Sequence, residues 1–184
     1  MLKAFLAIVL FATAATAQAA SPDWHARLAE AIPLLGHRNW ILVVDSAYPL
    51  QTSPGIETIE TSAAQLDVLR AVLASINASI QVRALIYMDA ELPFIEDAEA
   101  PGASAYRSDV AGVLRNYRIE SIPHEKIIST IDEAGKTFHV LVLKTNMTIP
   151  YTSVFIRLDC KYWSADQEQR LRHRMTEAAA KQSP

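Results

Sequence analysis

The sequence predicts an α/β fold in which helices pack on a mainly parallel or mixed sheet. Apolar runs of strand length alternate along the chain with segments whose apolar residues recur at helical spacing. Half of the residues are hydrophobic, so the chain can bury one sizeable core. No linker long enough to divide the chain follows the first twenty residues. Together these observations indicate a single layered domain.

Residues 1–19 differ from the rest of the chain. Lys3 is followed by an apolar run from Ala4 to Ala15, and the small residues of Ala17-Gln18-Ala19 fit a cleavage site. This pattern predicts a signal peptide cleaved after these residues, and therefore a periplasmic or secreted protein without a stable membrane span. An uncleaved membrane anchor is the alternative interpretation. The expected parts are then the signal peptide at 1–19, an α/β domain at 20–163 and a charged C-terminal helix at 164–184.

The first half of the mature chain contains two predicted helices and three predicted strands. Trp24, Leu28 and Ile32 share one face of a helix expected over 21–35, and Pro33 should kink or shorten that helix. The elements expected next are a buried strand at Trp40–Asp45, a half-exposed strand at Ile56–Thr61, a helix capped by Ser62 over Ala63–Asn77, and a buried strand at Val82–Met88.

The second half begins with an acidic stretch, Asp89 to Ala103, which we interpret as a solvated loop because charge runs usually are. Ser164 to Gln167 has the pattern of a capping box that opens the C-terminal helix. Between these segments we expect a helix at Ser104–Tyr117, a helix at Pro123–Glu133, a strand at Thr137–Lys144 and a strand at Tyr151–Leu158.

Several classes of site are excluded by what the sequence lacks. It has no glycine-rich phosphate loop, no dinucleotide fingerprint and no nucleophile elbow. Cys160 is the only cysteine, so no internal disulfide can form, and no cysteine or histidine occurs at zinc-ligand spacing. The formal net charge of −3 argues against a nucleic-acid surface. We therefore expect no metal, no cofactor and no nucleic-acid partner.

The candidate site residues lie at the ends of predicted elements. His37 follows a helix stop, Asp45 ends a buried strand, and His124 begins a helix. Tyr151 and Ser153 begin a strand. Histidine can exchange a proton near neutral pH, and ligands of open α/β sheets bind at the carboxyl ends of strands. Each position also has a purely structural explanation. His37 can mark a helix end, Asp45 a turn and His124 a first helical turn, while Tyr151 and Ser153 can belong to an ordinary strand edge.

The order of these motifs resembles the D-ribose pyranase and L-fucose mutarotase family. The similar segments are Leu35-Gly36-His37, Val43 to Pro49, Ile122 to Lys126 and Pro150 to Ile156. The resemblance implies a ribose pyranase-like fold, His37 as proton donor, and Asp45, His124 and Tyr151 as sugar-binding groups. Ser153 stands where the family has asparagine and joins the substrate-binding set. The resemblance also implies a homo-oligomer whose sites are shared between subunits.

The function expected from this resemblance is that of a monosaccharide mutarotase or pyranase, which needs acid and base groups but no cofactor. An exported sugar- or small-ligand-binding protein that has the same fold without catalysis is a second hypothesis. An interaction module without a small ligand is a third. The first two hypotheses require the candidate side chains to meet around one cleft, either within one chain or completed by a neighbouring protomer.

Overall fold

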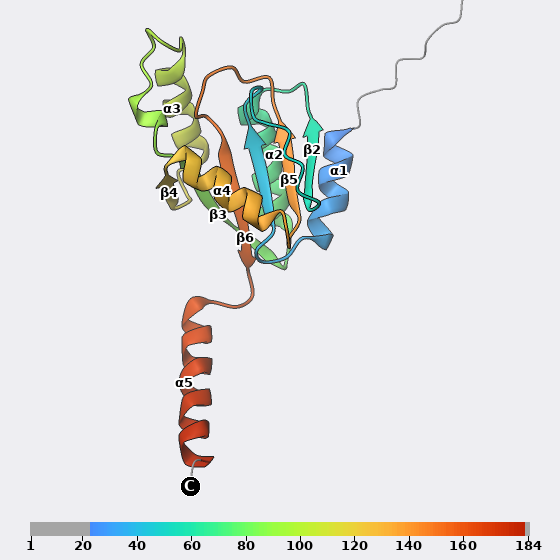
Figure 1. Cartoon of the computed structure of the whole chain (residues 1–184), viewed down its shortest axis with the longest axis vertical. Helices are drawn as coiled ribbons and strands as arrows, with labels where there is room; N and C mark the ends of the chain where they lie inside the picture. Colours follow the sequence, from blue (N-terminus) through green and yellow to red (C-terminus); the bar gives the residue numbers. More distant parts are fainter. Residues whose placement is uncertain (1–22, 183–184) are drawn as a thin grey trace, which may run out of the picture.

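A six-stranded mixed sheet forms the centre of the molecule (Figure 1). The computed structural model describes residues 23–182, and the predicted signal peptide lies outside them. The strands are β1 (Trp40–Val44), β2 (Ile56–Glu60), β3 (Val82–Asp89), β4 (Ile119–Ile122), β5 (Val140–Lys144) and β6 (Val154–Cys160).

The strand order across the sheet is β2-β5-β1-β6-β3-β4. Only β6 runs against its neighbours, pairing antiparallel with β1 on one side and β3 on the other, while all other adjacent strands are parallel. The predicted α/β fold with a mixed sheet is therefore confirmed.

Four helices of the described residues pack around the sheet, and the last helix extends away from it (Figure 1). They are α1 (Trp24–Ala31), α2 (Gln65–Ala78), α3 (Ala103–Val113), α4 (His124–Ala134) and α5 (Ala165–Gln182), with short 3-10 turns at Ile32–Leu34 and Leu92–Phe94. As predicted from Pro33, α1 ends early and tightens into a 3-10 turn, because proline cannot donate the next helical hydrogen bond.

Two helices begin later than predicted: α1 begins at Trp24 instead of position 21, and α2 begins at Gln65 instead of Ala63. Asp23 caps α1 by accepting the backbone N–H of His25 at 3.0 Å. The cap predicted at Ser62 is wrong: Ala64 precedes α2, and Ser62 has a φ of 51° with its hydroxyl donating to Glu60. Serine tolerates a local turn in place of a cap when a neighbouring carboxylate satisfies it.

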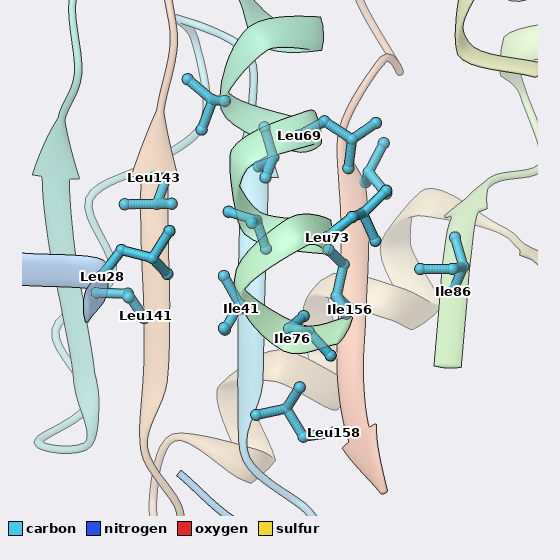
Figure 2. Close-up of a cluster of buried hydrophobic side chains, with 14 of the residues drawn as sticks. Leu28, Ile41, Leu69, Leu73, Ile76, Ile86, Leu141, Leu143, Ile156 and Leu158 are labelled. Atoms are coloured by element: carbon cyan, nitrogen blue, oxygen red, sulfur yellow. The ribbon is translucent and has the colours of Figure 1, made fainter. Parts of the chain in front are cut away.

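The core lies in two layers, one on each side of β1. Ile41 and Val43 face α2, where Figure 2 shows Leu69, Leu73 and Ile76 pointing toward the central strands. On the other face, Trp40, Leu42 and Val44 pack with α4 through residues that include Ile127 and Ile131. All five residues of β1 are buried, which explains its uninterrupted apolar run.

The edge strand β4 was not predicted. Three of its four residues, Ile119 to Ser121, are exposed, so it has neither the apolar run of a central strand nor a clear alternation. The stretch interpreted as a solvated loop also holds more structure than expected, because Asp89 completes β3 and Ala103 is buried at the start of α3.

α5 projects away from the sheet (Figure 1). The predicted capping box is confirmed at its start: the Ser164 backbone N–H donates to Gln167 Oε1 at 2.8 Å, and the Gln167 N–H donates to Ser164 Oγ at 3.2 Å. Within residues 23–182, no helix has the length and apolar character needed to cross a membrane.

Candidate functional site

Four of the five candidate residues come together at the carboxyl edge of the sheet. Asp45 directly follows β1, and His124 begins α4 after β4 has ended at the same edge. Because β6 is reversed, its beginning rather than its end lies there, which brings Tyr151 and Ser153 to that edge. A pocket of about 450 Å³ opens here, lined by Asp45, Tyr48, His124, Tyr151 and the adjoining loop residues.

Asp45 is held by hydrogen bonds to both carboxylate oxygens. Oδ1 accepts the backbone N–H of Ala47 at 2.9 Å, and Oδ2 accepts the hydroxyl of Ser153 at 3.0 Å. Ser153 is only 1 % exposed and does not line the pocket. Its hydroxyl therefore orients Asp45 toward the pocket, and it is the carboxylate that a ligand would meet.

His124 forms a dyad with Asp89, the last residue of β3. The His124 Nδ1 atom lies 3.0 Å from Asp89 Oδ1, and the His124 backbone N–H donates to both carboxylate oxygens of Glu91. The imidazole and the ring of Tyr151 pack nearly perpendicular to each other, with centroids 5.3 Å apart. Since Nδ1 is engaged by Asp89, Nε2 is the ring nitrogen available to a ligand.

Asp89 is a buried carboxyl with an unusual protonation range. Its side chain is fully buried, while that of His124 is 31 % exposed. Burial raises the pKa of Asp89 to about 6, and the hydrogen bond and charge of His124 limit that rise. Its Oδ2 atom has no hydrogen-bond partner among the described residues. A buried carboxyl whose pKa is raised in this way, beside a histidine, is typical of acid/base sites.

Tyr151 has a backbone conformation that its surroundings must enforce. Its φ is 59°, in the left-handed region that costs a bulky residue about 1–2 kcal/mol. The carbonyl of the next residue, Thr152, accepts hydrogen bonds from Gln65 Nε2 at 2.5 Å and the Tyr106 hydroxyl at 2.6 Å. This buried clamp fixes the segment that carries the Tyr151 ring and the Ser153 hydroxyl.

Tyr48 closes one wall of the pocket. Its hydroxyl donates to Gln51 at 2.9 Å, and its backbone carbonyl accepts from Lys144 at the end of β5. Burial, reinforced by nearby carboxylates that include Asp132 and Asp89, holds the pKa of Tyr48 above its usual range. The phenol therefore stays neutral and can offer a ligand an aromatic wall.

No family model matches the sequence, and no curated protein matches it significantly. Solved structures do match. RbsD of Bacillus subtilis in complex with D-ribose is 16 % identical with a TM-score of 0.53, covering 73 % of this chain and 92 % of its own. The chain has the fold of RbsD. This confirms, at the level of the fold, the family resemblance indicated by the motifs.

Two further structures match at TM-scores below 0.5. FucU of Bifidobacterium longum is 12 % identical with a TM-score of 0.49, covering 73 % of this chain and 94 % of its own. The fucose mutarotase of Streptococcus pneumoniae in complex with L-fucose is 17 % identical with a TM-score of 0.48, covering 76 % and 92 %. The fold assignment rests on RbsD alone.

His37 lies away from the other candidates in this RbsD-like fold. It precedes β1, whereas Asp45 follows it, and the five residues of a strand alone separate its ends by about 16 Å. His37 lines a different cavity, of about 540 Å³, together with Arg83, Asp159 and residues near α5. His37 and Asp45 therefore do not meet within one chain, because a strand carries its two ends to opposite edges of the sheet. The alternative in which a neighbouring protomer completes the cleft stays a prediction.

Sequence reasoning missed Asp89 and the Gln65–Tyr106 clamp. A usable signal for Asp89 was present, because it ends a buried strand as Asp45 does; the acidic residues after it hid this signal. Gln65 carried no such signal, since a glutamine at the start of an amphipathic helix is ordinary.

The arrangement can perform proton transfer at a bound hydroxylic ligand. His124 offers Nε2, Asp89 tunes it, and Asp45 offers carboxylate oxygens as hydrogen-bond acceptors. Among residues 23–182, no three histidine, cysteine, aspartate or glutamate side chains are grouped so that they could hold a metal ion.

Proposed function

We propose that this protein binds a free monosaccharide in the pocket between Asp45 and His124 and interconverts its anomers or ring forms. The observation that carries the proposal is the Asp89–His124 dyad, whose free Nε2 lies in the same pocket as an oriented carboxylate. The RbsD-like fold supports it, since that structure holds D-ribose.

The reaction needs one proton acceptor and one proton donor. His124 Nε2 takes the proton of the anomeric hydroxyl, the bond between the anomeric carbon and the ring oxygen breaks, and the ring oxygen takes the bond's electron pair and a proton from an acid. Rotation of the open-chain aldehyde and the reverse transfers close the ring on the other face. Protons balance over the cycle, so no cofactor enters.

We assign the donor to His37 of a neighbouring copy. Within one chain His37 is at the opposite edge of the sheet from Asp45, so only a second protomer can bring it to the pocket. This assignment makes the protein a homo-oligomer in which one copy's amino edge completes the next copy's carboxyl edge. Such a head-to-tail contact closes into a ring when the rotation allows.

Saturation-transfer NMR between the anomers of ribose and fucose tests the proposal. Wild-type protein should accelerate exchange for at least one sugar, while the His124→Ala and His37→Ala variants should each lose it. Mixing the two variants should restore activity at roughly a quarter of the sites, because one site in four then receives both histidines. If the protein accelerates anomer exchange for no sugar in a broad panel, the catalytic proposal is wrong. If mixing the two variants restores no activity, the proposal of a site shared between copies is wrong.

Sugar binding without catalysis is a second candidate function. Two observations favour it: Ser153 turns its hydroxyl to Asp45 rather than to the pocket, and His37 is absent from the pocket of a single chain. Calorimetric binding of a monosaccharide that is lost in Asp45→Asn, together with unaccelerated exchange, would select this function over the first.

We further propose that the protein is exported. The support is the charged, apolar and small-residue pattern of residues 1–19. Mass spectrometry of the protein recovered from the native host should find a chain that begins at Ala20, in the periplasmic or secreted fraction. An intact amino terminus in the cytoplasmic fraction would refute export.

A further inference from the structure

A second groove lies on the α4 face of the sheet. Its volume is about 520 Å³, and no residue lines both this groove and the pocket of Asp45. Trp40 of β1 and Arg157 of β6 are paired neighbours that form its floor. Lys126 and later residues of α4 form one wall, and Arg38 and Phe138 close one end.

The groove carries three cations from three separate elements. Arg38, Lys126 and Arg157 form no ion pair within residues 23–182, whereas other arginines, such as Arg27 and Arg83, pair with carboxylates. The one acidic residue of the lining, Glu133, accepts a hydrogen bond from Lys136 at 2.6 Å, which offsets its charge. The groove is therefore a local positive field in a chain whose formal net charge is −3.

The remaining lining of the groove combines aromatic and apolar side chains with three hydroxyl-bearing residues. The indole of Trp40 is buried beneath it, and the Arg38 guanidinium sits 5.8 Å from the centre of the Phe138 ring. A stacked guanidinium keeps its N–H groups free at the rim for a planar anion. Ser129 and Thr130 donate their hydroxyl protons to α4 carbonyls, so they can only accept from a ligand.

We propose that this groove binds a small organic anion, a phosphate monoester or carboxylate carried on an apolar or aromatic body. Arginine is suited to bidentate contact with such groups, and lysine adds a point charge. The volume falls within the range of small-ligand pockets, and the Trp40 floor takes the ligand's apolar part. This site is separate from the proposed sugar pocket and does not depend on it.

Calorimetry with phenyl phosphate as the probe tests the proposal on the full mature chain. Phenyl phosphate should bind more tightly than phenol, which lacks the anion, and than inorganic phosphate, which lacks the ring. Arg157→Gln and Lys126→Gln should each weaken binding about tenfold, because each removes a charged hydrogen bond. Arg118→Gln is the matched control, since Arg118 is an exposed arginine outside the groove, and it should leave binding unchanged.

Three results would overturn the inference. The first is that folded wild-type protein, checked by circular dichroism, shows no saturable binding of phenyl phosphate at millimolar concentration. Another is equal weakening by Arg118→Gln, which would mean diffuse surface charge. The third is that phenyl phosphate does not bind and that Arg157→Gln changes the oligomeric state measured by light scattering. In that case the groove would bind carboxylates of a second copy of the chain.

Discussion

The two ends of β1 differ in how their polar residues are held. At the carboxyl end, Asp45 has partners on both oxygens, and the nearby His124 is fixed by a fully buried aspartate. At the amino end, His37 and Arg38 are exposed, and the structure gives the His37 ring no hydrogen bond or ion pair within residues 23–182. The two ends of β1 thus differ: neighbouring residues hold Asp45 and His124 in place at the carboxyl end, while no described neighbour holds the His37 ring at the amino end.

This contrast teaches where preorganisation comes from. The carboxyl edge gathers residues from β1, β3, β6 and α4, each held by a neighbour from another element. At the amino edge, the Arg83–Asp159 pair joins β3 to β6, but His37 stands on the short connection before β1 without such a partner among residues 23–182. A site that must hold a charge in place needs such cross-element support. Apart from His37, to which we assign the proton donor, we therefore expect changes at the carboxyl edge to have larger effects than changes at the amino edge.

The largest effect is expected from His124→Ala. Removing the group that exchanges the proton should lower the rate of sugar exchange by roughly 10²–10⁴-fold. His173→Ala, on the exposed surface of α5, is the matched control and should leave the rate unchanged. Saturation-transfer NMR measures both. An undiminished exchange rate in His124→Ala would contradict the proposal that the carboxyl edge holds the catalytic site.

Asp89 should act on stability and activity in opposite directions as pH rises. Its folded-state pKa is about 6, above the ordinary value of 3.8, so the folded protein binds more protons than the unfolded chain between these values. The free energy of unfolding should therefore fall as pH rises from about 4 to about 6, by up to roughly 3 kcal/mol. Exchange should rise through pH 6, because ionised Asp89 orients His124 with Nε2 unprotonated.

Urea unfolding and NMR exchange, each from pH 4 to pH 8, check this prediction. In Asp89→Asn the fall in stability over the lower part of this range should disappear, since asparagine does not titrate. The variant should also lose exchange above pH 6. An unchanged pH dependence of the unfolding free energy in Asp89→Asn would show that another group causes it.

A smaller effect is expected at the buried clamp behind Tyr151. Tyr106→Phe removes one of two hydrogen bonds to the Thr152 carbonyl, while Gln65 retains the other. We expect a loss of about 0.5–1.5 kcal/mol in the free energy of unfolding, with weaker sugar binding as Tyr151 loses its fixed position. Tyr162→Phe, on an exposed side chain, is the control. A stability loss without any change in sugar affinity would separate the clamp from the pocket.

The smallest effect is expected from a change at Arg83, an amino-edge residue to which no proton transfer is assigned. Arg83→Gln breaks the partly exposed pair with Asp159, which solvent screening reduces to about 0.2–1 kcal/mol. Exchange should be unchanged, because the Arg83 and Asp159 side chains hydrogen-bond to each other and not to His37 or to a residue that lines the pocket of Asp45. A loss of activity as large as that of His124→Ala would erase the distinction between the two edges.

Much of the fold could be predicted because its elements carry local patterns. β1 is an uninterrupted apolar run because both of its faces are buried, and the apolar residues of α2 recur at helical spacing because only one of its faces is buried. The capping box of α5 is a contact within four residues. The exposed strand β4 could not be predicted, since pairing with β3 holds it and its partner residues lie 33 positions earlier in the chain.

The candidate site was predictable in its members more than in its geometry. Asp45, His124 and Tyr151 were found as polar residues at element ends, and they line one pocket. The position of His37 could not be inferred from its closeness to Asp45 in the sequence, because residues on either side of a strand are carried apart. The role of Asp89 depended on burial, which only the packing of α4 against β3 reveals.

The last strand of the chain is also the one that joins the sheet. β6 lies between β1 and β3, so the trio β2-β5-β1 and the pair β3-β4 have no direct pairing with each other. During synthesis, the six-stranded sheet cannot be completed until residues 154–160 have left the ribosome. Completion of the sheet is therefore a late event in the synthesis of the chain.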